Sequence, residues 1–217
     1  MQKAQELKKY FTNWKNIITF IILLVFVFLA FYLRIGNLGH LAFWGDDGHT
    51  FIGTTSILKY GYPLLPSGNI LWHGILGYYI DAIFVLVLGT GEFAFRLVSV
   101  LFGVAAVLLI YFTGRDLVNR YVGLLAAAAM SLSSWYIHFS REARYYSMLQ
   151  FFYLLSFYFF YRGFVRENKK YIILATLFIC LTPLVHGIGF LLILLFIPLL
   201  FLKKRNFFRI RIKKYRN

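Results

Sequence analysis

The chain has 217 residues, of which 60% are hydrophobic, 21% are aromatic and only 14% are charged. A soluble domain carries about 25% charged and about 45–50% apolar residues, so this composition leaves too little polar surface for a water-soluble protein. Lys and Arg outnumber Asp and Glu by 23 to 8, and this net charge of +15 would indicate nucleic-acid binding in a soluble chain. Because the basic residues lie between long apolar runs, we expect instead an integral membrane protein whose partner is the lipid bilayer, with no nucleic acid.

Six apolar runs with few or no charges each predict a membrane-spanning helix. They cover residues 17–33, 97–112, 121–139, 145–161, 171–185 and 188–202. A span needs about 17–25 residues, and the last two runs are short, so the turn Thr182–Gly187 between them predicts a helical hairpin. Only helices and closed barrels satisfy their backbone groups in lipid, and these runs lack the alternation of barrel strands. We therefore expect an all-α integral membrane fold with about six transmembrane helices.

A seventh apolar run, Ile70–Leu88, is expected to lie in the membrane interface. His73, Gly77 and Asp81 recur in it at four-residue spacing, which predicts one polar stripe along an amphipathic helix. If this run does not span, 18 of the 23 basic residues are cytoplasmic together with both termini, whereas a span here would turn 14 of those 18 outward. The positive-inside rule favours the first arrangement, in a multi-pass protein of the cell membrane. The first apolar run is too long for a signal peptide and no small-residue cleavage site follows, so we expect a retained helix.

This topology predicts three regions, listed in chain order: a cytoplasmic tail 1–16, a transmembrane module 17–202 and a basic cytoplasmic tail 203–217 that suits anionic lipid. One large external loop, residues 34–94, carries two predicted amphipathic juxtamembrane helices at about 50–60 and 70–88. All five His residues and five of the eight acidic residues fall on the external side. Any chemistry is therefore expected at the external face.

Two adjacent acidic residues, Asp46 and Asp47, follow Trp44 in this loop and precede His49. Asp is a common N-cap of helices, so the spacing alone leaves open both a capping role and a chemical role. A metal-dependent hydrolase that uses Asp46, Asp47, His49 and another external His also stays open. No two of the His residues, however, have the spacing of a helical metal motif.

A basic segment, Ser140–Tyr146, begins the fourth predicted span. We expect Arg141, Arg144 and Tyr145 to share one helical face. Two Arg residues at a helix N-terminus oppose the macrodipole unless an anion binds there, and guanidinium forks hold phosphate well. The alternative is that these Arg side chains extend to lipid headgroups. For Arg96, an ion pair with Glu92 four residues earlier is favoured over a lipid phosphate.

The order of these motifs resembles the dolichyl-phosphate-mannose–protein mannosyltransferase and aminoarabinose transferase type of the C-class (GT-C) glycosyltransferases. The resemblance covers about residues 17–200 and is carried by the segments Trp44–Asp47, Gly61–Pro63, His73–Tyr79, Gly89–Arg96, Gly114–Arg115 and Ser140–Tyr145. It implies a multi-pass enzyme that moves a sugar from a polyprenyl-phosphate donor to a protein, lipid or glycan acceptor on the non-cytoplasmic side.

Carried over residue by residue, the resemblance makes Asp46 the catalytic base. The second acid of the family's pair is usually Glu and here is Asp47, a shorter carboxylate. His73 stands where a Lys or His of the relatives faces the donor phosphate. We expect the further substrate-binding residues to be His49, Arg96, Arg141, Glu142, Arg144 and Tyr145. We expect no cofactor and leave a divalent cation open.

The expected chemistry needs one base and no general acid, because a phosphate is a good leaving group. One carboxylate takes the acceptor's proton during in-line attack, which inverts the anomeric carbon, while cations meet the charge that grows on the phosphate. Members of the family usually have more than ten spans, so the resemblance implies an N-terminal module with a missing C-terminal half or a partner subunit. The alternative is a non-catalytic membrane protein that binds or carries lipid-linked sugars.

Overall fold

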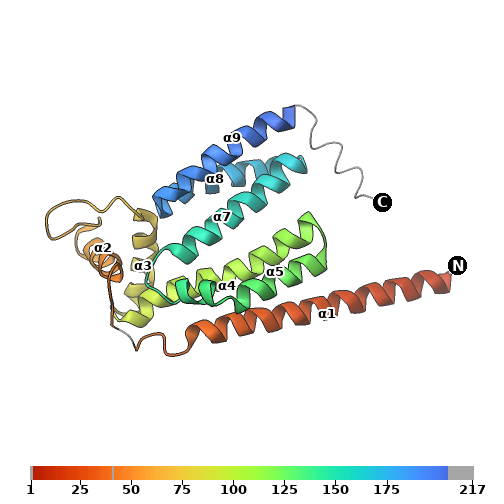
Figure 1. Cartoon of the computed structure of the whole chain (residues 1–217), viewed down its shortest axis with the longest axis horizontal. Helices are drawn as coiled ribbons and strands as arrows, with labels where there is room; N and C mark the ends of the chain where they lie inside the picture. The colour runs from red at the N-terminus through yellow and green to blue at the C-terminus, as the bar shows by residue number, and fades with distance from the viewer. Residues whose placement is uncertain (1, 41, 205–217) are drawn as a thin grey trace.

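The computed structural model describes residues 2–40 and 42–204, and this part of the chain is helical without any β-strand (Figure 1). Its α-helices are α1 (Gln2–Ile35), α2 (Asp47–Tyr60), α3 (Ile75–Leu88), α4 (Glu92–Leu117), α5 (Arg120–Leu132), α6 (Ser134–Phe139), α7 (Tyr146–Phe160), α8 (Lys169–Val185) and α9 (Phe190–Lys204). A π-helical turn, Tyr161–Val165, follows α7, and a 3-10 turn, Gly187–Gly189, joins α8 to α9. Most of the predicted tail 203–217 lies outside the described residues.

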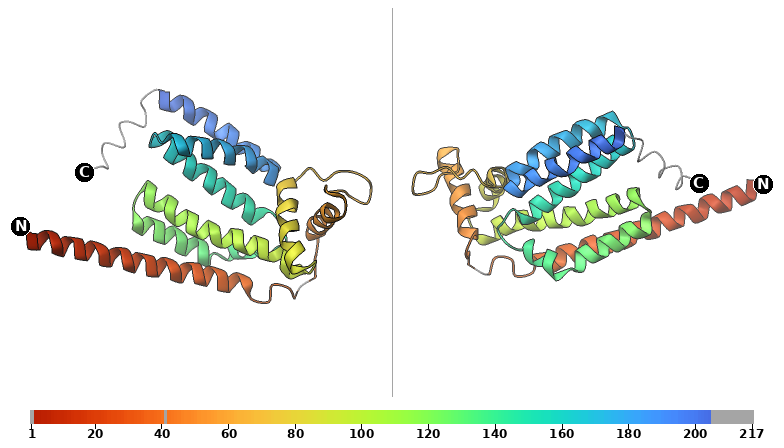
Figure 2. Two further views of the ribbon diagram at one scale, coloured as in Figure 1. Left: turned by 180° about the vertical axis from the view of Figure 1, so that it is seen from behind. Right: turned by 45° about the horizontal axis from the view of Figure 1, so that its top comes forward.

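The long helices lie along one common direction, and the two helices of the loop lie across one end of the bundle. Figures 1 and 2 show α2 and α3 at the end opposite to both termini. One apolar core joins α1, α4 and α5 through residues such as Leu23, Val107 and Ala127, and a second joins α4, α7 and α8 through Val98, Phe152 and Val185. Helices α2 and α3 therefore cover one end of the bundle.

Two helices of the described part are long and apolar enough to cross a membrane, namely the Asn13–Ile35 segment of α1 and the whole of α4. Shorter apolar helices occupy Ile75–Leu88, Arg120–Leu132 and Gly187–Ile197. The prediction of an all-helical chain is confirmed for the described residues. The number of six spans stays a prediction.

The apolar run 121–139 does not form one helix, so this part of the prediction is wrong. Ser133 has an extended backbone (φ −64°, ψ 120°) and separates α5 from the short α6. The run contains Ser131, Ser133 and Ser134 but no charge or Pro, and its average hydrophobicity gave no signal for this break. The predicted hairpin between the last two runs is present as α8, the 3-10 turn and α9.

The first loop helix agrees with its prediction, whereas the second begins later than expected. Helix α2 ends at Gly61, whose φ of 84° is left-handed and whose N–H donates to the carbonyl of Ile57. The predicted helix 70–88 begins only at Ile75, because Ile70 forms an isolated bridge with Leu64 and Gly74 is left-handed at φ 78°.

The predicted polar stripe of His73, Gly77 and Asp81 is therefore wrong. His73 precedes α3, and both Gly77 and Asp81 are buried against the protein instead of facing water.

The end of α5 is held by a buried arginine of α1. Arg34 is only 1% exposed, and its guanidinium donates to the carbonyl oxygens of Met130 (3.2 Å) and Ser131 (3.3 Å) at the C-terminus of α5. Its Nε–H donates to the hydroxyl of Ser140 at 2.8 Å. Gly103 of α4 permits this packing, since a Cβ there would lie 2.7 Å from the Cβ of Ser140. Arg34 thus fixes the segment that leads into the predicted basic site.

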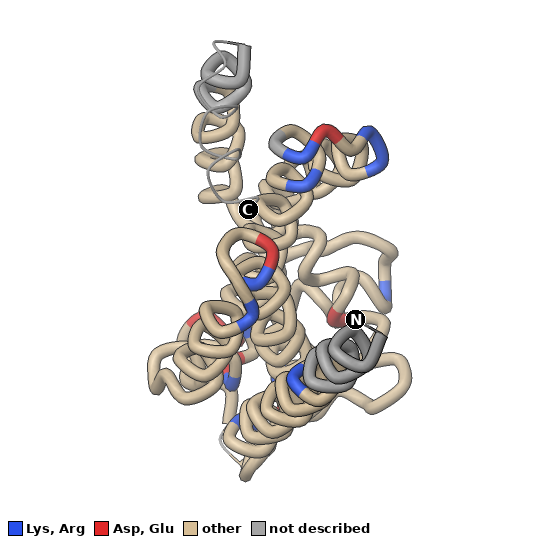
Figure 3. Tube along the Cα trace, turned by 90° about the vertical axis from the view of Figure 1, so that its right-hand side faces the viewer, with Lys and Arg blue, Asp and Glu red and all other residues tan. Residues whose placement is uncertain are grey.

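The end of the bundle opposite to α2 and α3 carries the basic helix ends, as Figure 3 shows from the side of the termini. Asp116 at the end of α4 accepts ion pairs from Arg115 (2.9 Å) and Arg162 (3.2 Å) and a hydrogen bond from Tyr158 (3.1 Å). The basic residues at these helix ends and in the connections between them are Arg115, Arg120, Arg162, Arg166, Lys169 and Lys170. That this end is the cytoplasmic side stays a prediction.

Candidate functional site

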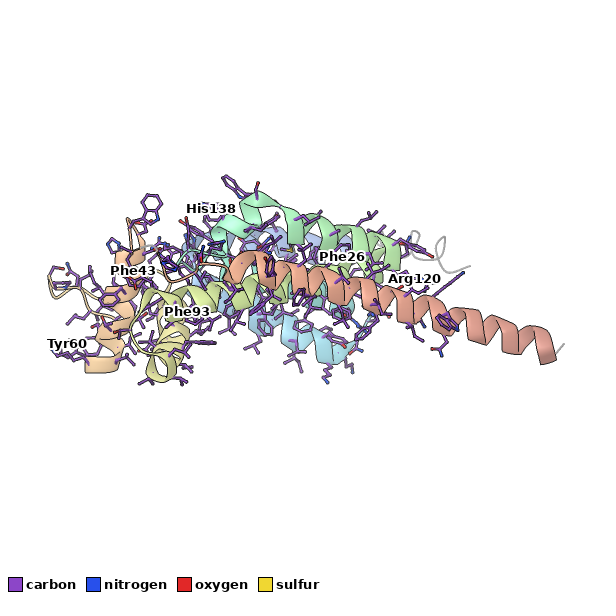
Figure 4. The ribbon with its side chains drawn as sticks, turned by 90° about the horizontal axis from the view of Figure 1, so that it is seen from below. Phe26, Phe43, Tyr60, Phe93, Arg120 and His138 are labelled. Atoms are coloured by element: carbon purple, nitrogen blue, oxygen red, sulfur yellow. The ribbon has the colours of Figure 1, made fainter. Side chains whose placement is uncertain are left out.

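The segments that carry the predicted site residues lie at the end of the bundle far from Arg120, where Figure 4 labels Phe43 and Phe93. An aromatic triangle places α2 on α4: the rings of Phe43, Phe51 and Phe95 lie 5.4–5.7 Å apart, centroid to centroid. Such aromatic contacts add roughly 0.5–1.5 kcal/mol per pair beyond burial. They fix the start of α2, where Asp46 is the N-cap and Asp47 is the first helical residue.

Asp46 directs its carboxylate toward Arg144. It occupies the N-cap position of α2, but its side chain makes no capping hydrogen bond. Its Oδ2 instead pairs with a guanidinium nitrogen of Arg144 at 2.9 Å, while the carboxylate remains 64% exposed. Asp46 is therefore not a simple capping residue, and its carboxylate is open to a ligand.

Arg144 is nearly buried and almost fully engaged. One terminal nitrogen donates to the backbone carbonyl of Asp46 and the other to the Asp46 carboxylate and the hydroxyl of Tyr145, each at 2.9 Å. The guanidinium also lies over the rings of Tyr145 (4.6 Å) and Tyr146 (5.7 Å). Its Nε–H is buried without a partner among the described residues. The Arg144 guanidinium is therefore fixed in place and keeps one buried N–H donor unsatisfied within that part of the chain.

Asp47 has a different environment from Asp46, although the two are adjacent. Its buried carboxylate lies 3.5 Å from Arg96, and the Arg96 guanidinium also donates to the carbonyls of Leu38 (3.0 Å) and Ala42 (3.3 Å). Burial raises the pKa of Asp47, and Arg96 opposes that shift. The expected ion pair of Arg96 with Glu92 is wrong, since the chain returns from the loop and brings Asp47 to Arg96. The pair fastens α2 to α4.

Arg141 lies apart from the Asp46 carboxylate. Its guanidinium donates to the carbonyls of Leu33 (3.3 Å) and Gly36 (2.7 Å) at the end of α1. The prediction that Arg141, Arg144 and Tyr145 share a helical face is wrong, because α7 begins only at Tyr146 and these residues form a turn. The turn lets neighbouring arginines point to different partners.

His73 reaches the site through Tyr145. Its ring centroid lies 5.4 Å from that of Tyr145 and 4.4 Å from that of His186, and the rings of Tyr145 and His186 lie 5.0 Å apart. Tyr145 connects this group to Arg144 through its hydroxyl, and burial raises its pKa to about 12, so the phenol stays protonated at neutral pH. The structure thus brings His73, Tyr145, Arg144 and Asp46 into one contiguous cluster.

Glu142 lies within electrostatic reach of Arg144, and no side-chain hydrogen bond, ion pair or ring contact joins His49 to this cluster among the described residues. Glu142 pairs with His138 at 3.1 Å, and burial raises the pKa of Glu142 while His138 opposes that shift. His49 is exposed on the first turn of α2. The metal-dependent interpretation expected acidic and His ligands around Asp46, but no group of three His, Cys, Asp or Glu suited to a metal occurs in residues 2–40 and 42–204.

A large apolar groove opens beside the cluster. It has a volume of about 1170 Å³ and runs between α5, α6, α7 and α9, with walls that include Trp135, Phe139, Tyr146, Leu149 and Leu195. Tyr146 belongs both to this wall and to the aromatic surface under Arg144. The groove therefore adjoins the cluster at the ring of Tyr146.

Three residues of the site were not found from the sequence. Tyr78 is buried, and its pKa is raised by burial and further by Asp81 and Asp46 while Arg144 opposes the shift, so it lies within the electrostatic reach of the site. His186 follows α8 and was assigned only to the external side. Arg34 positions Ser140. The sequence signal for these three is weak, because each contact joins segments far apart in the chain.

The fold and the site together define an all-helical protein with long apolar helices and a carboxylate–guanidinium cluster at one end of the bundle. The model of the family described as dolichyl-phosphate-mannose-protein mannosyltransferase matches residues 72–215. The chain therefore belongs to this family, whose members are membrane-integral glycosyltransferases. No curated protein and no solved structure matches the chain. The matched segment contains His73, Arg96 and the turn 140–145, whereas the acidic pair precedes it.

Proposed function

We propose that this chain, with a C-terminal part or a partner subunit where one is needed, transfers a sugar from a polyprenyl-phosphate donor to an acceptor on the non-cytoplasmic side of the cell membrane. The observation that carries the proposal is the 2.9 Å pairing of exposed Asp46 with nearly buried Arg144. A general base must be open to the acceptor, while a cation that meets a leaving phosphate acts most strongly where water is excluded. The side chains are 64% and 8% exposed, respectively, which suits these two roles.

In the proposed reaction, an acceptor hydroxyl attacks the anomeric carbon of the donor. The bond from that carbon to the phosphate oxygen breaks, and its electron pair stays on the phosphate. Asp46 takes the acceptor's proton, and the configuration at the anomeric carbon inverts. The positive charge of the Arg144 guanidinium stabilises the growing negative charge, while its terminal nitrogens hold the backbone and carboxylate of Asp46.

The apolar groove supports a donor that carries a lipid. A phosphate bound at Arg144 would lie against Tyr146, whose ring also forms part of the groove wall. A polyprenyl chain leaving that phosphate would therefore enter an apolar space beside α7. The groove and the guanidinium are arranged for a molecule with one charged end and one long apolar end.

We propose a membrane layout in which α1, α4, α5 with α6, α7, α8 and α9 cross the bilayer. Helices α2 and α3 then lie at the outer interface, and both termini lie in the cytoplasm. The support is the distribution of charge: the basic helix ends seen in Figure 3 are opposite to the end that carries Asp46 and Arg144. This distribution follows the positive-inside rule.

The decisive experiment compares the wild-type chain with Asp46→Asn in membranes supplied with a polyprenyl-phosphate sugar donor. Loss of a general base costs roughly 10²–10⁴ in rate, so transfer should fall by about that factor. Donor binding should change little, because Asn keeps the size of the side chain and Arg144 stays in place. Glu92→Gln is the matched control, since it removes an acidic residue at the same end of the molecule.

The outcomes separate the proposal from its alternative. Transfer by wild type that is lost in Asp46→Asn but kept in Glu92→Gln supports the proposal. Normal transfer by Asp46→Asn would overturn the assignment of the base. Donor binding by wild type without any transfer, in the presence of membranes that supply acceptors, would favour a protein that binds or carries lipid-linked sugars.

A further inference from the structure

Two imidazoles meet beside Arg144 although they come from segments more than a hundred residues apart. His73 lies in the segment before α3, and His186 follows α8. Their ring centroids are 4.4 Å apart with an interplanar angle of 75°. Gly187 packs next to this pair, since a Cβ on it would lie 3.8 Å from the ring of His73. Gly74 closes the other side, since a Cβ there would lie 2.9 Å from the ring of Tyr145. The absence of side chains at Gly74 and Gly187 thus leaves room for the rings of His73, Tyr145 and His186 to pack together.

The hydrogen bonding of His186 fixes which of its nitrogens faces outward. Its Nδ1 accepts the backbone N–H of Ile188 at 3.0 Å. In the neutral ring the proton must then be on Nε2, which is left as a donor. His73 is exposed, and its ring has only aromatic contacts with Tyr145 and His186 among the described residues. Both rings therefore offer N–H groups to a ligand.

The surroundings of the pair decide its charge. The titratable and charged groups that face it are Arg144 and Tyr145 from the turn, Tyr146 from α7, and each imidazole for the other. Burial lowers the pKa of His186, and His73 and Arg144 lower it further. Two imidazoles at this distance resist carrying two positive charges at once, so the pair is suited to holding at most one proton. An anion bound between them would favour that proton.

The proposed transfer changes the charge of the phosphate at this place. The donor is a phosphodiester with one negative charge, and breaking its bond to the sugar leaves the electron pair on the oxygen. The product is a phosphomonoester, whose second pKa is about 6, so it carries two negative charges above that pH. A site that gains one positive charge is matched to the product and not to the donor.

We propose that His73 and His186 form a two-imidazole clamp that takes up one proton from solvent when the polyprenyl phosphomonoester product is bound. This rests on the proposed function, and it adds His186 to the residues that contact the phosphate. The clamp holds the product more tightly as the pH falls, so product release becomes slower at mildly acidic pH. The proton balance is complete, because Asp46 takes the acceptor's proton and the clamp exchanges its own proton with water.

The test measures binding of geranylgeranyl phosphate and of its methyl ester to the purified full chain, with EDTA in every sample. The monoester is the product mimic, whereas the methyl diester carries one charge at all pH values used. Uptake of one proton makes affinity change by up to tenfold per pH unit, so monoester affinity should rise about tenfold from about pH 8.5 to about pH 6.5. The diester should change by less than about threefold over that range.

The informative variant combines His186→Asn with His73→Asn. Asn at position 186 places Oδ1 where it can accept the Ile188 N–H in place of Nδ1, and neither Asn can be protonated. This double variant should keep part of the monoester binding at about pH 8.5 and lose the rise toward about pH 6.5. Each single variant leaves one imidazole of the pair and should keep part of the rise, and His40→Asn, an exposed His outside the cluster, should retain the wild-type dependence.

An unchanged pH dependence in the double variant His73→Asn/His186→Asn overturns the clamp while leaving the transferase proposal intact. An equal pH dependence for the diester also overturns it, because the clamp would then not distinguish product from donor. Failure of wild type to bind either ligand overturns both proposals together. If Asp46→Asn loses transfer while the monoester affinity of the wild type does not change with pH, the protein is a transferase that lacks the clamp.

Discussion

The carboxylate of Asp47 and the guanidinium of Arg96 lie 3.5 Å apart, with only 4% and 6% of their side chains exposed. This buried pair joins the first turn of α2 to the first turns of α4. It places Asp46, one residue earlier, at the surface beside Arg144. The second acid of the pair therefore has a positioning role, and the first has the open carboxylate.

Removal of one partner of this pair should destabilise the protein. Asp47→Asn leaves the buried Arg96 without its counter-charge, and breaking a buried pair costs about 3–5 kcal/mol. For a chain of this size that corresponds to a decrease in Tm of roughly 6–20 °C. The double variant Asp47→Leu/Arg96→Met should regain part of the loss, since it leaves no unpaired charge. Thermal unfolding in detergent measures both, and a Tm for Asp47→Asn equal to that of wild type would contradict the role.

Arg144→Lys should reduce transfer much more than an Arg→Lys change elsewhere. Lys cannot reproduce the three bonds that the guanidinium makes with Asp46 and Tyr145, nor the free Nε–H. The expected loss is about 10²-fold in transfer rate, the usual effect of removing a donor that stabilises developing charge. Arg120→Lys, at the opposite end of the bundle, is the control. The measurement is the steady-state transfer rate of both variants. Similar rates for the two would contradict the binding of a phosphate at Arg144.

Gly103→Ala should destabilise the bundle and displace the turn that carries Arg144. The new Cβ would lie 2.7 Å from the Cβ of Ser140 and 3.4 Å from the Nε of Arg34. Overpacking of this kind costs typically about 1–3 kcal/mol. Gly48→Ala is a suitable comparison, because nothing lies within 4 Å of its Cβ and Ala is favoured in a helix by up to about 1 kcal/mol. Tm values of the two variants should move in opposite directions.

Asp81 should make the stability of the protein depend on pH. Burial raises the pKa of this carboxyl from its ordinary value of 3.8 to about 8. Between these values the folded state binds more protons than the unfolded state, so stability is greatest below 3.8 and falls as the pH rises to about 8. Asp81→Asn should remove this contribution and raise the Tm most at alkaline pH.

The measurement for Asp81 is the difference in Tm between variant and wild type across the pH range. Asp47 and Glu142 also have raised pKa values, and the difference cancels their contribution. Glu92→Gln should give a small difference. A Tm difference for Asp81→Asn that does not grow with pH would show that the carboxyl is solvated.

Local sequence patterns predicted the helices well, and they predicted the partners of charged side chains poorly. Apolar runs and the Gly61 stop specified α1, α2, α4 and α8 because these signals act within a few residues. The pairing of Arg96 with Asp47 required the loop to return across α4, which no spacing rule encodes. A helical spacing rule instead favoured Glu92.

The candidate site was predictable in its main residues and not in its supports. Asp46 and Arg144 were named from motif order, and the structure brings them to 2.9 Å. Arg141 was expected beside them, but the turn before α7 sends it to the end of α1. His186 and Arg34 contribute through contacts between distant helices, which only the folded bundle establishes.

The Asp46–Arg144 ion pair has a consequence for biosynthesis. Its two halves are separated by 98 positions, and the second imidazole is encoded still later, after α8. A nascent polypeptide emerging into the bilayer has neither the cation nor the histidine doublet until most of its helices have been inserted. Sugar-transfer competence should accordingly appear late and abruptly during membrane insertion, and truncated translation products that stop before α7 should be inert toward lipid-linked sugars.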